Sequence, residues 1–92
     1  MEPVSIVITC YNQGPFIAEA IESALSQTSP ASEILVVDDG STDDTDQIVG
    51  RFSGVRYIRQ PNQGLVAVTR NRGIQETAGA YIVFVDGDDR LL

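Results

Sequence analysis

Residues 34–43 read Ile-Leu-Val-Val-Asp-Asp-Gly-Ser-Thr-Asp, and no other segment constrains the architecture of the chain more strongly. Four consecutive apolar residues bounded by turn formers are typical of a strand covered on both faces, as in a parallel sheet. Asp38 and Asp39 follow this strand at its carboxyl end, where open parallel sheets bind their ligands. Residues 84–89, Phe-Val-Asp-Gly-Asp-Asp, have the same apolar-then-acidic order. We therefore expect two equivalent strand ends at one edge of a sheet.

The rest of the chain alternates between strand-like and helix-like segments. Strands are expected where β-branched or alternating apolar residues occur, at 4–9, 34–37, 55–59 and 81–85. Helices are expected between them, at about 15–27, 41–51 and 65–77. A capping box of Ser41 and Asp44 should open the second helix, and Ala78-Gly79 should end the third. The order β-α-β-α-β-α-β predicts an α/β fold, a Rossmann-like parallel sheet with flanking helices and right-handed crossovers.

The length of 92 residues is enough for one compact domain with a modest core. The chain stops at Leu91-Leu92, directly after its most acidic loop, so we expect residues 1–92 to be the amino-terminal part of a larger, truncated domain. Its last strand would then expose surface, which makes self-association a risk. No stretch is long enough to cross a bilayer and no secretory signal is recognisable, so we expect this part in the cytoplasm. The pattern leaves membrane attachment of the full protein open.

The composition excludes several classes of chemistry. The chain has no histidine, and its six basic residues are all arginines. Histidine acid–base catalysis, Schiff-base chemistry and a P-loop lysine are therefore excluded. A metal here must be a hard cation held by oxygen, such as Mg²⁺ or Mn²⁺. The net charge of −7 argues against nucleic acid as a partner.

The single cysteine, Cys10, excludes an internal disulfide and fits a reducing compartment. It stands at the end of the first predicted strand. With no histidine to activate its thiol, we expect a small buried apolar side chain and no nucleophile.

The acidic loop after the last strand offers a metal site. Three carboxylates, those of Asp86, Asp88 and Asp89, fall within four residues. Two like charges ~4 Å apart repel by about 4 kcal/mol at an effective dielectric constant of 20. A divalent cation would turn this repulsion into binding. A solvated acidic turn or a helix N-cap explains the same residues, and the pattern alone leaves both interpretations open.

Other polar residues near the strand ends also have two interpretations. Asp38 and Asp39 are placed to accept hydrogen bonds from a ribose or a base, whereas helix capping explains Asp43 better. Arg70 would clamp a diphosphate if it faces this edge, or would be surface charge. Tyr11 would stack on a base, or would pack over its own loop.

Four motifs resemble those of family 2 glycosyltransferases of the GT-A fold, and together they span nearly the whole chain. They are Val-Ser-Ile-Val-Ile-Thr-Cys-Tyr-Asn at 4–12, Ile-Leu-Val-Val-Asp-Asp-Gly-Ser-Thr-Asp at 34–43, Asn-Gln-Gly-Leu-Val-Ala-Val-Thr-Arg-Asn-Arg-Gly at 62–73 and Phe-Val-Asp-Gly-Asp-Asp at 84–89. The family more often has proline where this chain has Thr9, which leaves the role of Thr9 open.

The resemblance implies a site for a nucleoside-diphosphate-sugar, with UDP or GDP as the nucleotide, in an enzyme of cell-wall or polysaccharide biosynthesis. Residues it places around the nucleotide-sugar are Thr9, Tyr11, Asn12, Asp38, Asp39, Arg70 and Asp86. Residues it assigns to Mn²⁺ or Mg²⁺ are Asp88, as direct ligand, and Asp86, with Asp89 a weaker candidate.

The chemistry that the resemblance implies is a single displacement with inversion at the anomeric carbon. The metal assists departure of the diphosphate, and a carboxylate general base activates the acceptor hydroxyl. The resemblance places that base and the site for a glycan, lipid or protein acceptor beyond Leu92. The isolated chain is thus expected to bind nucleotide without transferring sugar.

Related α/β enzymes fit the sequence less well. A nucleotidyltransferase or a dinucleotide-dependent oxidoreductase would need a glycine-rich loop after the first strand, and residues 9–15 lack it. A phosphatase would have its Asp-x-Asp pair after the first strand and not the last. A non-catalytic protein-interaction module on the same scaffold stays open.

Overall fold

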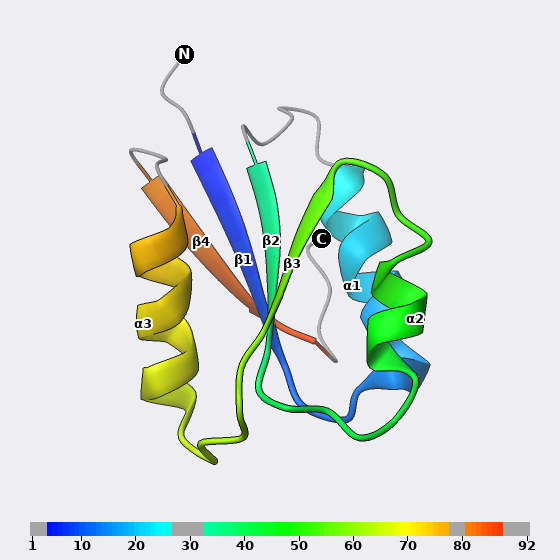
Figure 1. The fold of residues 1–92 in the computed structure, drawn as a ribbon. Helices are drawn as coiled ribbons and strands as arrows, with labels where there is room; N and C mark the ends of the chain where they lie inside the picture. The colour runs from blue at the N-terminus through cyan, green and yellow to red at the C-terminus, as the bar shows by residue number, and fades with distance from the viewer. Residues whose placement is uncertain (1–3, 27–32, 78–80, 88–92) are drawn as a thin grey trace.

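Four parallel strands form one sheet in the computed structural model, and helices cover both of its faces (Figure 1). The structure describes residues 4–26, 33–77 and 81–87. Along the chain its elements are β1 (Val4–Cys10), α1 (Gly14–Leu25), β2 (Glu33–Asp38), α2 (Thr45–Val49), β3 (Val55–Arg59), α3 (Val66–Glu76) and β4 (Tyr81–Asp86). The predicted α/β class and order of elements are confirmed. The expected stop at Ala78-Gly79 lies outside the described residues, as do Asp88 and Asp89.

The strands lie in the order β3-β2-β1-β4, and each neighbouring pair is parallel. The chain moves outward from β1 to β3 and then returns across the sheet to place β4 on the other side of β1. The strand order therefore reverses between β1 and β4. In open parallel sheets, ligands bind beyond the carboxyl ends of the strands at such a reversal.

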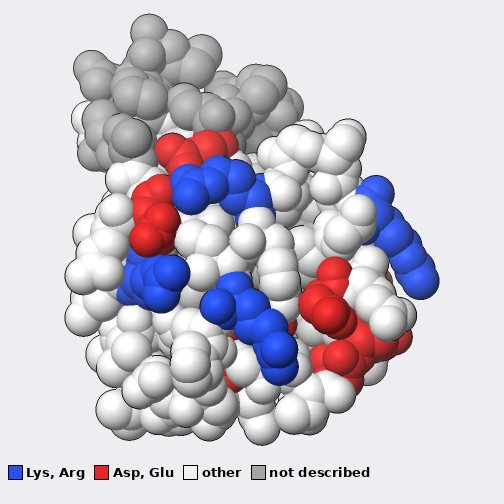
Figure 2. Space-filling view, in the orientation of Figure 1, with Lys and Arg blue, Asp and Glu red and all other residues white. Residues whose placement is uncertain are grey.

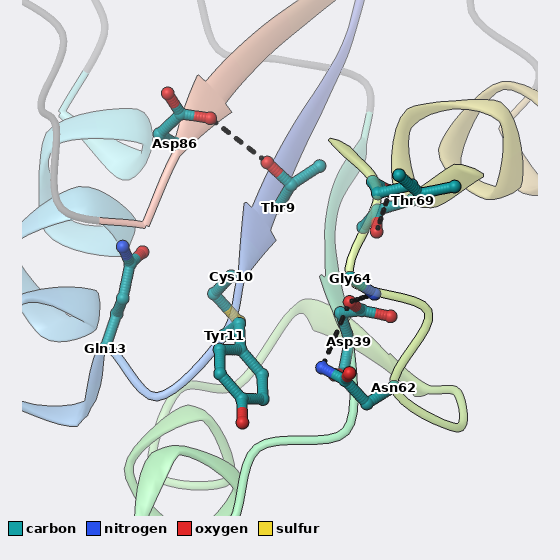
Figure 3. Close-up of a pocket in the computed structure, with 10 residues that line it drawn as sticks. Thr9, Cys10, Tyr11, Gln13, Asp39, Asn62, Gly64, Thr69 and Asp86 are labelled. Atoms are coloured by element: carbon teal, nitrogen blue, oxygen red, sulfur yellow. Dashed lines mark hydrogen bonds between the residues drawn. The ribbon is translucent and has the colours of Figure 1, made fainter. Parts of the chain in front are cut away.

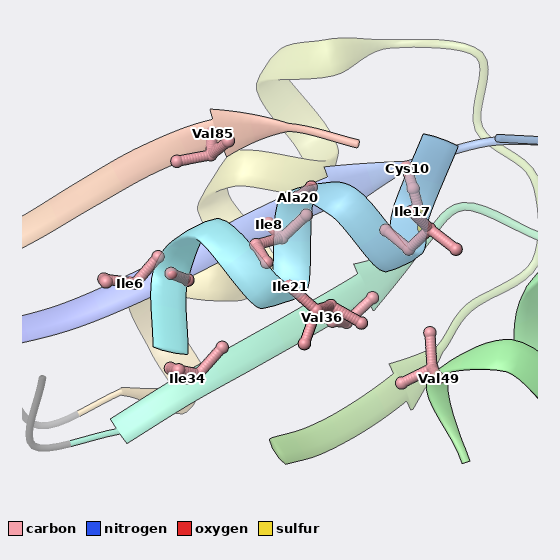
Figure 4. Close-up of a cluster of buried hydrophobic side chains, with 11 residues drawn as sticks. Ile6, Ile8, Cys10, Ile17, Ala20, Ile21, Ile34, Val36, Val49 and Val85 are labelled. Atoms are coloured by element: carbon pink, nitrogen blue, oxygen red, sulfur yellow. The ribbon is translucent and has the colours of Figure 1, made fainter. Parts of the chain in front are cut away.

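Alternating side chains divide the core between the two faces of the sheet. Ile6, Ile8 and Val36 point to the face covered by α1 and α2, where they pack with Ile17 and Ile21 (Figure 4). The other face carries a smaller cluster, whose buried members are Val7, Leu35 and Val37. This face is covered by α3, which contacts β1 and β2. Both faces of β1 and β2 are thus buried, as the continuous apolar runs predict.

The predicted capping box at the start of α2 is wrong. The helix begins at Thr45, and its N-cap Asp44 makes no side-chain hydrogen bond to it. The Ser41 hydroxyl instead donates to the buried carboxylate of Asp38. Asp43 accepts the backbone N–H of Thr45 at 3.0 Å. The Ser41 side chain is therefore engaged by Asp38 and Asn12 and is not available to cap the helix, which starts four residues later than expected.

Exposed carboxylates gather on the side of the molecule that carries α2 (Figure 2). Asp43, Asp44 and Asp46 are all exposed there.

Among the described residues, no helix is both long and apolar enough to cross a membrane.

Candidate functional site

A cavity of about 490 Å³ lies where the strand order reverses, beyond the carboxyl ends of β1 and β4 and beside the start of α3 (Figure 3). Its walls come from four separate stretches of the chain, 9–13, 39, 62–69 and 86. The lining residues are Thr9, Cys10, Tyr11, Gln13, Asp39, Asn62, Gly64, Leu65, Thr69 and Asp86. Four of the residues predicted for the nucleotide-sugar, Thr9, Tyr11, Asp39 and Asp86, are thus brought together.

The pleat of the sheet explains why these residues meet. Val7, Val37 and Phe84 belong to the α3 side of the core. Side chains two positions apart point to the same face of a sheet, so Thr9, Asp39 and Asp86 follow Val7, Val37 and Phe84 on the α3 side. The apolar rows under α3 therefore end in polar groups where α3 begins, and these groups line the cavity.

Thr9 and Asp86 join β1 to β4 at the edge of the cavity. They are register partners, and the Thr9 hydroxyl donates to Oδ1 of Asp86 at 3.3 Å. The backbone N–H of Gly87 donates to the Thr9 carbonyl at 2.8 Å. A Cβ at Gly87 would lie 2.8 Å from Cβ of Cys10. Glycine is therefore needed after Asp86, because a side chain there would collide with Cys10 where the chain leaves β4 beside β1.

The Asp39 carboxylate organises the loop that follows β3. Its Oδ1 accepts Nε2 of Gln60 at 2.9 Å and the backbone N–H of Gln63 at 2.9 Å. Its Oδ2 accepts the backbone N–H of Gly64 at 3.1 Å and Nδ2 of Asn62 at 3.3 Å. Burial alone would raise the pKa of this carboxyl, but the hydrogen bonds from Gln60, Gln63 and Gly64 outweigh it and hold the pKa below its ordinary value. Asp39 is therefore a charged group fixed in the cavity wall.

Asp38 lies on the opposite side of its strand and does not line the cavity. Its carboxylate is fully buried, accepts the backbone N–H of Ser41 at 2.8 Å and also accepts the hydroxyl of Tyr57. Burial and this hydrogen bond raise the pKa of Tyr57. The geometry gives Asp38 a structural role, and its contact with a nucleotide stays a prediction without geometric support.

Asn12 likewise supports the site from outside the cavity. It has a positive φ of 50°, a conformation that Asn tolerates better than most residues. Its Oδ1 accepts the backbone N–H of Thr42 at 2.7 Å, and its own N–H donates to Ser41 Oγ at 2.9 Å. These bonds tie the loop after β1, including Tyr11, to the loop after β2.

Tyr11 and Arg70 differ in how they relate to the cavity. The Tyr11 ring lines it and is 47% exposed, so an apolar face is available to a ligand. The Arg70 guanidinium lies 5.5 Å from the centre of the Phe84 ring, in a cation–π arrangement, and is not among the lining residues. The predicted clamp on a diphosphate therefore stays a prediction for Arg70.

Cys10 is buried, as expected. Burial, with smaller effects from the carboxylates of Asp38, Asp43 and Asp39, raises the pKa of its thiol well above the usual range. The thiol therefore stays protonated at neutral pH, which excludes a role as nucleophile.

The described residues contain no group of three or more His, Cys, Asp or Glu side chains that could hold a metal ion. Asp86 is the described carboxylate of the predicted metal set, whereas Asp88 lies outside the described residues. The site also includes lining residues that were not predicted for it, namely Gln13 and four residues of the motif at 62–73: Asn62, Gly64, Leu65 and Thr69. The sequence did indicate a place at the site for Asn62 and Gly64, because both lie in a loop directly after a predicted strand.

Comparison with known proteins identifies the family. The model of Glycosyl transferase family 2 matches residues 5–92. The glycosyltransferase GlyG of Streptococcus pneumoniae is 41% identical over 96% of this chain and 31% of its own length. The uncharacterised glycosyltransferase EpsJ of Bacillus subtilis is 46% identical over 94% of the chain and 26% of its own length.

Solved structures that share the fold include two with a bound nucleotide or nucleotide-sugar. The crystal structure of S. aureus TarS 1–349 in complex with UDP superposes with a TM-score of 0.88 at 32% identity, covering 96% of this chain and 28% of that one. The mannosyltransferase PcManGT of Pyrobaculum calidifontis, in complex with GDP-Man and Mn²⁺, gives a TM-score of 0.89 at 25% identity, covering 97% of this chain and 28% of that one. The chain thus spans about a third or less of the length of these proteins, and within that span it belongs to glycosyl transferase family 2 and has the GT-A fold.

Proposed function

We propose that this chain forms the donor-binding part of a glycosyltransferase and that the cavity between β1, β4 and α3 takes the nucleoside diphosphate of an activated sugar. The observation that carries the proposal is the convergence of Thr9, Tyr11, Asp39 and Asp86 on one cavity at the reversal of the strand order. The TarS and PcManGT structures, which contain UDP and GDP-Man, support a nucleotide-sugar as the ligand.

Four of the lining residues offer contacts that suit different parts of such a ligand. The exposed Tyr11 ring provides a stacking face for a base. Thr9 and Asp39 supply polar groups beside it, and Asp86 would meet the ribose or the metal at the β4 side. Asn12 and Asp38 would act indirectly, by fixing the loops that carry Tyr11 and Asp39.

A hard divalent cation fits the groups present. Carboxylate and hydroxyl oxygens line the cavity, and the one thiol there, Cys10, is held protonated. We propose that Asp86 and Asp88 hold Mn²⁺ or Mg²⁺, in line with the Mn²⁺ of the PcManGT complex. Such an ion would supply Lewis-acid assistance to the departing diphosphate. Asp86, which accepts the Thr9 hydroxyl, would place that charge at the edge of the cavity.

The full reaction needs groups beyond those of the described site. We propose transfer with inversion to an acceptor hydroxyl of a glycan, lipid or protein, with the general base and acceptor site in the further sequence that the longer relatives have. The isolated chain would then bind nucleotide and leave the sugar untransferred. The same proposal includes self-association of the chain through β4, which exposes Tyr81 and Val83. It also includes a cytoplasmic location.

Calorimetric titration with UDP and with GDP, in Mn²⁺ and in EDTA, tests the proposal. We expect one of the nucleotides to bind more tightly in Mn²⁺, and Asp86→Asn and Asp88→Asn to remove that metal dependence. Asp46→Asn makes the same change on exposed α2 and should bind like the unmodified chain. Nucleotide binding that depends neither on the metal nor on Asp86 and Asp88 would refute the metal site. Absence of binding by either nucleotide would refute the donor site and favour a protein-interaction module.

A further inference from the structure

Three polar side chains with almost no exposure form a hydrogen-bonded row along the α3 side of the cavity. Asp39, Gln60 and Thr69 are 6%, 6% and 4% exposed. Nε2 of Gln60 donates to Oδ1 of Asp39 at 2.9 Å and to Oγ1 of Thr69 at 3.4 Å. One amide group thus bridges the end of β2 and the first turn of α3.

Gln60 itself does not line the cavity, although both of its partners do. Its backbone N–H donates to the carbonyl of Asp38 at 2.9 Å, which anchors the base of the side chain on the neighbouring strand. We propose that Gln60 is a positioning residue, which holds the Asp39 carboxylate in the cavity wall in the orientation that the loop 61–64 and a bound nucleotide require. This inference rests on the proposed donor site.

The chemistry of the amide suits this role. A carboxamide is a neutral donor at every pH, so it keeps Asp39 bonded without adding charge. Glutamate at position 60 would place a second carboxylate against the first, and an apolar residue would remove a donor from a buried charge. Hydrogen bonds to charged groups are among the strongest in proteins, so the loss of this one should be measurable.

The test compares Gln60→Met with the unmodified chain. Methionine has a similar length and no donor. The affinity for the nucleotide that binds should fall about tenfold, as expected for one charge-assisted hydrogen bond. The pKa of the Asp39 carboxyl, followed by NMR of ¹³C-labelled aspartate in the free chain, should rise by about one unit. The resolved Asp39 signal separates its titration from those of the other labelled aspartates.

Two further variants sharpen the test. Thr69→Val is isosteric and breaks the bridge at its other end, so it should change affinity and pKa in the same direction by a smaller amount. Gln75→Met makes the same chemical change at an exposed position of α3 and should change neither. If Gln60→Met fails to fold, Thr69→Val alone decides.

The outcomes separate this inference from the donor-site proposal. If the unmodified chain binds nucleotide and the Gln60 and Thr69 variants keep both its affinity and the pKa of Asp39, Gln60 is only structural and the inference is overturned. If no nucleotide binds the unmodified chain, the donor site is refuted, and the inference is overturned with it. A raised pKa of Asp39 in the variants would then show only that Gln60 holds the loop 61–64.

Discussion

Replacing Gly73 by alanine should destabilise the chain, although the same change inside a helix usually stabilises it. Gly73 is an interior residue of α3, where alanine is favoured over glycine by up to about 1 kcal/mol. A Cβ at this position, however, would lie 2.5 Å from Cγ1 of Val7 and 3.3 Å from its Cγ2. Val7 is fully buried and β-branched, so its side chain cannot rotate away.

The magnitude follows from these two opposing effects. Overpacking a well-filled core costs about 1–3 kcal/mol. The 2.5 Å contact is far inside normal packing distance, so the upper part of that range applies. After subtraction of the helix gain, we expect the free energy of unfolding to fall by about 1–2 kcal/mol. Because α3 also carries Thr69 and Leu65 to the cavity, its displacement should weaken nucleotide binding as well.

Urea unfolding followed by circular dichroism measures this change. Gly50→Ala is the matched control, because a Cβ there meets its closest neighbour, the Asp46 carbonyl oxygen, at 3.4 Å. It should be neutral or slightly stabilising. The double variant Val7→Ala with Gly73→Ala should be more stable than the sum of the single changes predicts, since the smaller residue 7 makes room. A Gly73→Ala chain that is as stable as the unmodified one would refute the argument from close packing.

Three other outcomes are expected. Asp43→Ala removes the acceptor for the N–H groups of Gly14 and Thr45. The free energy of unfolding, measured by urea titration, should fall by about 0.5–1 kcal/mol. Equal stability of the two chains would contradict the capping role of Asp43. The pKa values of Asp39 and Asp43 are both lowered in the folded chain from the ordinary 3.8. The stabilisation that these carboxylates give is therefore present above about pH 4 and is lost as the pH falls through their folded pKa values. Acid unfolding should be less steep in Asp43→Asn, and an identical acid transition would contradict this. The buried thiol of Cys10 should resist a thiol reagent at pH 8 until urea unfolds the chain, and rapid labelling of the native chain would contradict its burial.

The periodicities of the sequence were sufficient to predict the sheet and its helices. Long apolar runs such as 34–37 can only be satisfied between two covering layers, so β2 was predictable from local information. The start of α2 was not, because the partner of Ser41 is the buried Asp38 carboxylate and the N–H of Asn12 also binds Ser41. The bond to Asp38 is local, but the bond from Asn12 exists only once the ends of β1 and β2 lie side by side.

The site was predictable in its place and only partly in its members. Parallel strands put all four predicted loops at one edge, which correctly located the cavity. Asp38 and Asp39 are neighbours in sequence, yet the pleat sends one into the α1 side and the other into the cavity wall. The sequence does not say which side becomes the cavity, because that depends on where α3 packs. Arg70 illustrates the same limit, since its contact with Phe84 depends on the packing of α3 against β4.

The capping of α1 by an acidic side chain bears on how this fold balances the charge of a diphosphate. In many dinucleotide-binding sheets, the helix after the first strand presents free N–H groups and a positive dipole end to the phosphates. Here the N–H of Gly14 donates to Oδ2 of Asp43 at 3.0 Å, and a Cβ at Gly14 would lie 2.4 Å from Oδ1 of Asp44. The glycine thus makes room for carboxylates where those folds admit an anion. Under the proposed function, a chain of net charge −7 whose own aspartates occupy this helix end would need a bound cation as the counter-charge for the phosphates. Its affinity for nucleotide would then depend on the metal concentration.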